Sequence, residues 1–174
     1  TLRREGYQGD ITLVSPAPRF FYSPSLIWVP SGQRDESDLT LSLDAYFARQ
    51  KVTHFAASVT ALDLAQRTVE TDHGALAYDF LVIASGGRFL KKLPGIEHAT
   101  IPCEGYAPVA AYAEKLRALS GGHLAFGFAG NPDEPSAMRG GPVFEFLFGV
   151  DTLLRREGRR ARFKLAFFSP AAEP

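Results

Sequence analysis

The chain has 174 residues, enough for one ordinary domain or two small ones, and 45% of them are hydrophobic, a composition typical of globular proteins. Lys plus Arg and Asp plus Glu both number 19, so the overall charge gives no basis for binding nucleic acid or a membrane surface. The single cysteine excludes an internal disulfide, and together with the absence of a signal peptide it leads us to expect a cytoplasmic protein. No apolar run approaches the roughly 20 residues needed to span a bilayer.

The first half of the chain reads as a strand, an aromatic loop, a helix and a meander. Residues 11–14 are β-rich and end at Ser15-Pro16, as in a parallel strand. Residues 19–32 place aromatics between prolines, which indicates either a ligand wall or a hydrophobic loop buried in a core. Residues 41–50 have helical spacing. Residues 53–63, 67–71 and the apolar stretch after Asp72-His73-Gly74 predict a small antiparallel meander.

The second half predicts a buried strand and then a β-α-β unit. Residues 78–84 read YDFLVIA, which is typical of a buried parallel strand, and they lead directly into Ser85-Gly86-Gly87. A first helix is followed by a strand, a Gly/Pro loop and a second helix that begins at Pro142. The predicted ranges are 108–119 for the first helix, 123–129 for the strand, 130–141 for the loop, 142–157 for the second helix and 163–168 for the last strand.

One passage occurs twice. Residues 1–18 and 152–172 each contain a basic helix end, a glycine and an apolar strand closed by Ser-Pro. Gly6 matches Gly158 at an offset of 152 residues, and Ser15 matches Ser169 at an offset of 154. The second copy ends a β-α-β unit, so the repeat predicts two dinucleotide-binding halves.

Four stretches together resemble a known family. They are PRFFYSPSLIWVPSG at 18–32, residues 57–87, IPCEGYAPVAAY at 101–112 and RGGPVFEFLFGVDTLLRR at 139–156. In this order they resemble the FAD-dependent pyridine nucleotide disulfide oxidoreductase family, and within it most of all sulfide:quinone oxidoreductase and flavocytochrome c sulfide dehydrogenase.

The resemblance implies an α/β fold with a Rossmann-like, FAD/NAD(P)-binding parallel sheet and a small antiparallel β-meander, incomplete at both ends. Residues 1–118 would be a partial FAD-binding domain without its first strand and Gly-rich loop. Residues 119–174 would be the first β-α-β unit of a second, degenerate dinucleotide-binding domain. The loop before Pro142 lacks the glycine spacing of the dinucleotide fingerprint and carries Asp133 and Glu134, which disfavours a nicotinamide nucleotide.

The resemblance also implies which residues meet FAD. Ser15 stands where an acidic residue would grip ribose, Pro24 and Ser25 would lie by the flavin ring, and the main chain of Ser58 and Val59 would hold the adenine. The stretch that passes the FAD backbone would be Ala84, Ser85, Gly86 and Gly87, although Gly86-Gly87 also fits a plain turn after a strand.

Cys103 falls where the resembled enzymes keep a redox cysteine, and it is the candidate catalytic residue. A lone cysteine also fits a small buried hydrophobe, and Arg139 stands where a partner thiol would be expected. The scattered histidines have no metal-ligand spacing, so we expect no metal site. The arginines from Arg155 to Arg162 follow a helix C-terminus, where capping explains them better than an acidic partner or lipid.

The resemblance thus implies part of an FAD-dependent oxidoreductase that oxidises sulfide or a related small donor and passes electrons to a quinone. Two alternatives stay open: a non-catalytic remnant or interaction module without cofactor, and a flavoprotein of the NADH:quinone reductase kind. We expect no nucleic-acid partner. Peripheral contact with the inner face of a membrane, through parts outside this chain, and a homo-oligomer are both compatible with the resemblance.

Overall fold

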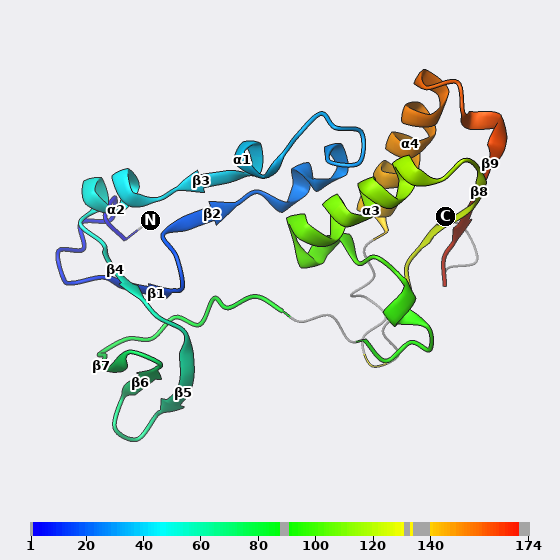
Figure 1. Cartoon of the computed structure of the whole chain (residues 1–174). Coiled ribbons are helices and arrows are strands. Elements are labelled where there is room, and N and C mark those ends of the chain that lie inside the picture. The colour runs from blue at the N-terminus through cyan, green and yellow to red at the C-terminus, as the bar shows by residue number, and fades with distance from the viewer. Residues whose placement is uncertain (1, 88–90, 131–132, 134–139, 171–174) are drawn as a thin grey trace. The chain divides into compact units, whose positions relative to one another are not determined.

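The computed structural model describes residues 2–87, 91–130, 133 and 140–170 (Figure 1). The chain divides into two compact units. Unit 1 consists of residues 1–21 and 40–90, and unit 2 consists of residues 22–39 and 91–174. No helix among the described residues is both long enough and apolar enough to cross a membrane.

Unit 1 contains a two-stranded parallel sheet. Strand β1 (Thr12–Ser15) pairs with β4 (Thr53–Ala56), so that Leu13 lies opposite His54. Helix α2 (Asp44–Gln50) precedes β4 and packs against it through the buried Phe47. An antiparallel ladder joins β2 (Arg19–Phe21) to β3 (Thr40–Ser42). The predicted strand at 11–14 and the helix within 41–50 are confirmed.

The predicted meander is also confirmed. Strands β5 (Val59–Asp63), β6 (Thr68–Thr71) and β7 (Gly74–Ala77) form a three-stranded antiparallel sheet in that order. Gly74, with a φ of +120°, follows the turn between the last two strands, where a side chain would be strained. The stretch expected as one strand at 53–63 is two, because β4 pairs with β1 whereas β5 pairs with β6.

The prediction of a buried strand at residues 78–84 is wrong. The segment forms no strand, and Phe80, Val82 and Ile83 are 89%, 84% and 67% exposed. A parallel strand is stabilised by backbone hydrogen bonds to its neighbours, and no described strand pairs with this segment. Its apolar composition, which the sequence does show, is therefore not enough to form the strand.

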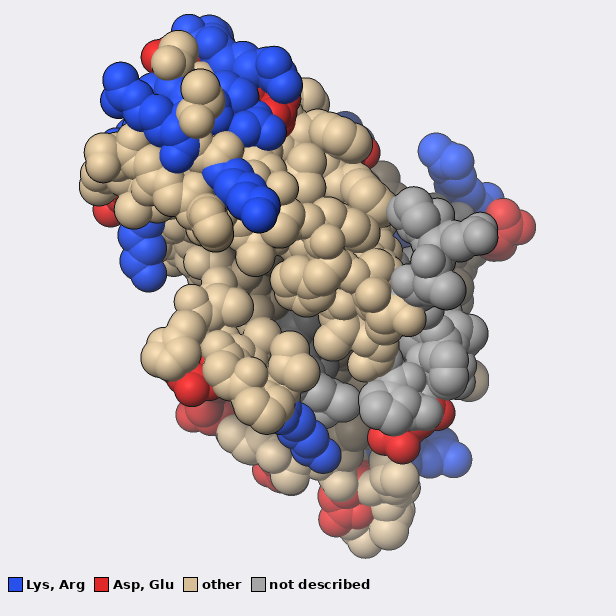
Figure 2. Space-filling view, turned by 90° about the vertical axis from the view of Figure 1, so that its right-hand side faces the viewer, with Lys and Arg blue, Asp and Glu red and all other residues tan. Residues whose placement is uncertain are grey.

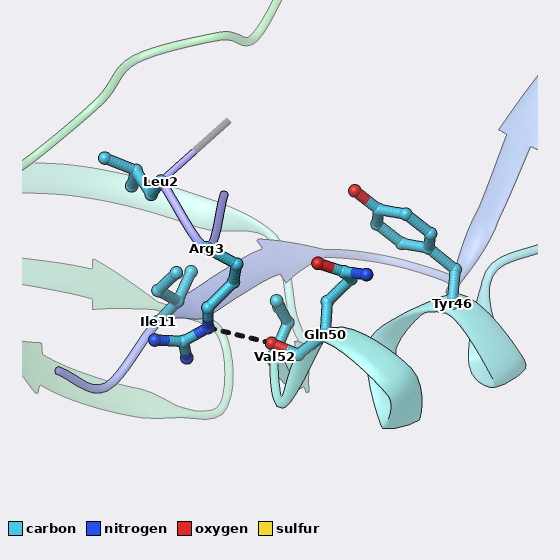
Figure 3. Close-up of a pocket in the computed structure, with 6 residues that line it drawn as sticks. All are labelled: Leu2, Arg3, Ile11, Tyr46, Gln50 and Val52. Carbon is cyan, nitrogen blue, oxygen red and sulfur yellow. Dashed lines mark hydrogen bonds between the residues drawn. The ribbon is translucent and has the colours of Figure 1, made fainter. Parts of the chain in front are cut away.

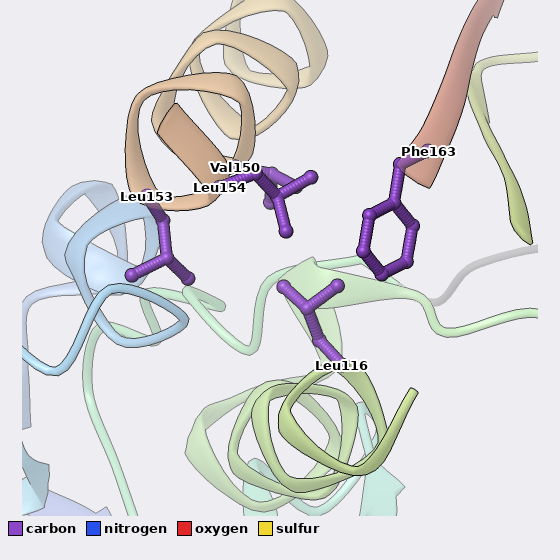
Figure 4. Packing of buried hydrophobic residues seen from close by; sticks show 5 residues of the cluster. All are labelled: Leu116, Val150, Leu153, Leu154 and Phe163. Carbon is purple, nitrogen blue, oxygen red and sulfur yellow. The ribbon is translucent and has the colours of Figure 1, made fainter. Parts of the chain in front are cut away.

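Unit 2 contains the predicted β-α-β unit. Strand β8 (Gly122–Gly127) pairs in parallel with β9 (Phe163–Phe168), and α4 (Gly141–Arg156) connects them through η5 (Arg160–Arg162). Helix α3 (Tyr106–Ala118) precedes β8. Figure 4 shows the core that joins these elements. Its members, each at most 4% exposed, are Leu116, Val150, Leu153, Leu154 and Phe163.

Short helices complete unit 2. They are η1 (Ser23–Trp28), α1 (Glu36–Leu39), η2 (Ile96–His98) and η3 (Pro102–Glu104). Of the two readings of the aromatic loop at 19–32, burial in a core is confirmed for part of the loop, and the ligand wall stays a prediction. Leu26 and Val29 are buried, and η1 packs against α4, whereas Tyr22 and Trp28 stay 49% and 43% exposed.

The repeated passage folds the same way twice. Gly6 and Gly158 both adopt a left-handed conformation, with φ of +83° and +66°. In the first copy the Gly6 N–H donates to the Arg3 carbonyl and the Tyr7 N–H to the Leu2 carbonyl. In the second copy Gly158 and Arg159 donate to the carbonyls of Arg155 and Leu154 at the same two spacings. In the second copy these two hydrogen bonds form the Schellman termination of α4, and the first copy has the same two bonds at a turn. Each copy then enters a parallel strand, β1 or β9.

Candidate functional site

The carboxyl end of β1 holds Ser15 in a fixed orientation. The Ser15 hydroxyl donates to the Ala17 carbonyl at 3.0 Å. His54 Nε2 lies 3.0 Å from the Ser15 carbonyl oxygen and 3.1 Å from its Oγ, and the imidazole stacks on Phe47 at a centroid distance of 5.8 Å. Because its proton is committed to Ala17, Ser15 Oγ can meet a ligand only as a hydrogen-bond acceptor. An ionised carboxylate, the group expected at this position, is likewise an acceptor.

The next predicted contacts, Ser58 and Val59, lie beside the same end of the sheet. The Ala57 N–H donates to the Ser15 carbonyl at 3.3 Å, which brings the start of β5 next to Ser15. The Ser58 N–H donates to Asp72 Oδ1 at 2.8 Å, and its carbonyl accepts from the Asp72 N–H at 3.1 Å. A main-chain contact from Ser58 to an adenine would therefore compete with Asp72.

Asp72 is itself well stabilised as a carboxylate. Hydrogen bonds from His73 and from the Ser58 N–H lower its pKa below the ordinary value. His73 Nδ1 lies 2.8 Å from Asp72 Oδ1. Negative charge therefore persists at this turn at neutral pH.

Ala84, Ser85, Gly86 and Gly87 form an exposed stretch without regular structure. Gly86 has a φ of +74°, which only glycine adopts readily. A Cβ added at Gly86 or Gly87 would meet nothing within 4 Å. The main chain here is open to close approach by a ligand.

The remaining predicted residues lie in unit 2. Pro24 and Ser25 belong to η1, Cys103 belongs to η3, and these two short helices contact each other. The Cys103 thiol is exposed. This observation disfavours the reading of Cys103 as a buried hydrophobe. The next residue, Glu104, pairs with Lys91 at 2.5 Å.

Aromatic side chains gather where β8 and β9 end. The Phe144 ring, from the first turn of α4, stacks on Phe167 at 4.2 Å, and Phe128 lies 6.2 Å from Phe167. A Cβ on Gly140 would lie 2.5 Å from the Phe128 ring. In doubly wound folds a nucleotide binds at this edge of the sheet, and three aromatic rings gather there in this chain.

One further cavity of about 270 Å³ lies in unit 1 (Figure 3). Arg3 lines it and donates through Nε to the Gln50 carbonyl at 2.9 Å. Ile11 and Val52, which also line the cavity, precede β1 and β4, so it lies at the edge opposite Ser15. None of the predicted site residues lines it.

His54 was missed from the sequence. It was read only as one of four scattered histidines, and nothing in a single sequence pairs it with Ser15, 39 residues away. The sequence analysis placed residues 53–63 in the meander, whereas His54 lies in β4, which pairs in parallel with β1.

Comparisons with known proteins agree with the fold. No protein-family profile matches the chain. The chain is 32% identical over 79 residues to the type II NADH:quinone oxidoreductase of Staphylococcus haemolyticus. The matched residues make up 45% of this chain and 20% of that protein. It is 25% identical over 163 residues to the sulfide-quinone reductase of Aquifex aeolicus, covering 91% of this chain and 36% of that protein.

The structural comparison points the same way. The crystal structure of the sulfide:quinone oxidoreductase from Aquifex aeolicus superposes with a TM-score of 0.84 at 25% identity, over 97% of this chain and 39% of that one. The chain spans little more than a third of the length of that curated relative, and less of the staphylococcal one. The resemblance read from the motifs is confirmed: the chain is similar over part of their length to FAD-dependent pyridine nucleotide disulfide oxidoreductases, including sulfide:quinone oxidoreductase, and it has their Rossmann-like α/β fold with a small antiparallel meander.

Proposed function

We propose that the chain is part of an FAD-dependent oxidoreductase that takes electrons from sulfide or a related small donor and passes them to a quinone. The observation that carries this proposal is the likeness to sulfide:quinone oxidoreductase over 97% of the chain. In this proposal residues 1–118 contribute to the flavin domain and residues 119–174 begin the second domain.

In this proposal the residues of unit 1 would bind the adenosine half of FAD. Ser15 offers an oriented acceptor to a ribose hydroxyl, and the open main chain at Gly86-Gly87 would lie along the cofactor backbone. Ser58 and Val59 would border the adenine, and Ala84 and Ser85 would lead into the glycines. FAD, when bound, would supply the two-electron acceptor for the donor. Pro24 and Ser25 would flank its ring.

Cys103 is proposed to carry the sulfur. Its thiolate and a hydrosulfide ion would join by an S–S bond, which gives a persulfide and releases one proton and two electrons. A quinone takes up two electrons and two protons to become a quinol, so the overall reaction balances when the second proton comes from water. The exposure of the thiol supports access by a small anion.

An NADH donor is the second candidate, because a relative is named a type II NADH:quinone oxidoreductase. The aromatic cluster of Phe128, Phe144 and Phe167 weighs against it, since these rings gather at the end of the parallel strands, the edge at which a dinucleotide would bind. We therefore favour the small donor.

The test compares donors with the protein as its gene encodes it. Quinone reduction is followed with sulfide or with NADH, for wild type, Cys103→Ser and Glu104→Gln. The proposal expects sulfide-dependent reduction that Cys103→Ser lowers at least tenfold and that Glu104→Gln, which keeps the thiol, leaves largely intact. Reduction by NADH alone would select the second candidate. A folded protein without cofactor or either activity would select the non-catalytic remnant.

The setting follows from the acceptor. A quinone is dissolved in the bilayer, so we propose a cytoplasmic protein that works at the inner face of the membrane. A homo-oligomer is compatible with this and is tested by light scattering.

A further inference from the structure

Six arginines gather at one end of unit 2, and we name this surface the basic end. They come from the last turns of α3 and α4 and from the segment that leads through η5 into β9. Figure 2 shows the blue side chains concentrated at one end of the surface. The members of the basic end are Arg117, Arg155, Arg156, Arg159, Arg160 and Arg162.

Two carboxylates neutralise part of this charge. Asp151 accepts from Arg155 Nε at 2.6 Å and also from Arg160, and these hydrogen bonds lower its pKa below the ordinary value. Glu157 accepts from Arg159 at 2.9 Å. These two carboxylates pair with three of the six guanidinium groups, Arg155, Arg159 and Arg160, so the surface keeps an excess of positive charge.

Capping accounts for only part of the cluster. Arg159 donates to the carbonyls of Leu116, Arg117 and Leu119, which closes the end of α3, and Arg160 donates to the Phe163 carbonyl. Arg117 and Arg162 are exposed, and Arg156 reaches only the Ser31 carbonyl, at 3.3 Å. Within the part of the chain that the structure describes, no carboxylate pairs with any of these three.

We propose that the basic end binds the anionic headgroups of a lipid bilayer. The chain as a whole has no net charge, so the surface is a local feature rather than a consequence of a basic composition. Guanidinium groups bind phosphate oxygens through two parallel hydrogen bonds, and clustered basic residues are attracted to anionic lipid. A bilayer supplies many phosphates in one plane and so matches a cluster that is spread over the ends of α3 and α4 and over η5.

The choice of lipid over an acidic protein rests on the proposed function, because a quinone acceptor is reached at a membrane. The basic end places that contact within this chain, in addition to any made by other parts. Three guanidinium groups have no carboxylate partner among the described residues, those of Arg117, Arg156 and Arg162. They can approach lipid headgroups without breaking the hydrogen bonds that cap α3 and α4.

The experiment is sedimentation of the protein with vesicles, without donor or quinone, so that its outcome is independent of catalysis. Vesicles of phosphatidylcholine alone are compared with vesicles that also contain phosphatidylglycerol. The variants are Arg156→Gln with Arg162→Gln, and a charge-matched control, Arg4→Gln with Lys92→Gln, whose residues are exposed and outside the basic end. Urea unfolding curves establish that both double variants are folded.

The proposal expects binding to the phosphatidylglycerol vesicles that weakens strongly at about 1 M salt, where screening acts within ~3 Å. Each neutralised charge should lower the partition coefficient about fivefold, and the double variant about 25-fold. The control pair should change it less than about threefold. Equal binding to neutral and to phosphatidylglycerol vesicles would overturn the proposal, and so would an unchanged partition coefficient for the double variant. Binding of an acidic polypeptide by a protein that binds no vesicles would also overturn it.

Discussion

Replacing Gly158 by alanine tests the helix termination on which the internal repeat depends. Its φ of +66° is strained for any residue with a Cβ, although a Cβ there would meet nothing within 4 Å. The cost therefore comes from the backbone alone. A left-handed alanine loses roughly 1 to 2 kcal/mol, and the stiffer unfolded chain returns about 0.5 kcal/mol, so unfolding should become easier by about 1 kcal/mol.

Gly149→Ala is the matched control. Gly149 lies within α4, and the nearest atom to an added Cβ is the Ile27 carbonyl oxygen at 3.7 Å, an ordinary contact. Alanine should therefore raise the free energy of unfolding by about 0.5 to 1 kcal/mol. The two glycine-to-alanine changes, 9 residues apart, should therefore change the free energy of unfolding in opposite directions, as the different backbone conformations of the two glycines require.

Urea unfolding followed by the fluorescence of Trp28, the only tryptophan, measures both variants. Trp28 ends η1, which packs against α4, so its emission reports on unit 2. Gly158→Asn should lose less than Gly158→Ala, because asparagine tolerates this conformation better. A Gly158→Ala protein as stable as wild type would refute the termination, and with it the structural basis of the repeat.

Three further predictions concern the core of unit 2, a buried phenol and the candidate cofactor site. Leu154→Ala, at a fully buried position of the unit 2 core, should cost about 3 to 4 kcal/mol, whereas Leu64→Ala, at 71% exposure, should stay within about 0.5 kcal/mol; equal losses would contradict the core. Burial raises the pKa of Tyr112 to about 12, so its phenol ionises earlier in the unfolded chain, and stability should fall as pH rises from about 10 to 12. Tyr112→Phe should remove that loss, and an unchanged alkaline profile would refute the assignment. His54→Ala should weaken FAD binding about fivefold, because Ser15 loses the hydrogen bond that helps to orient it. His98→Ala, at an exposed site, should leave FAD binding unchanged. Equal effects of the two changes would show that His54 does not contribute to the cofactor site.

The sequence predicted the elements whose partners lie nearby in the chain. The helix of α4 and the strands on either side follow from periodicity, from Pro142 at the helix start and from Gly158 at its end. The meander follows from the turn at Asp72 to Gly74. These features are local, so their residues specify them without help from distant parts.

Long-range pairing set the limit of that reasoning. The apolar run at 78–84 was indistinguishable from a buried strand, because its burial depends on a neighbouring strand and not on its own residues. In the candidate site, Ser15 was assigned through the family resemblance, whereas its contact with His54 arises from the parallel pairing of β1 with β4. The aromatic stack of Phe144 on Phe167 likewise joins elements separated by a full helix.

Titration of FAD into the protein as its gene encodes it, followed by quenching of flavin fluorescence, tests the central claim most directly. The account predicts saturable binding with one FAD per chain, weakened by His54→Ala and unaffected by Cys103→Ser. A protein that unfolds cooperatively by Trp28 fluorescence and yet does not quench the flavin at any concentration would contradict it.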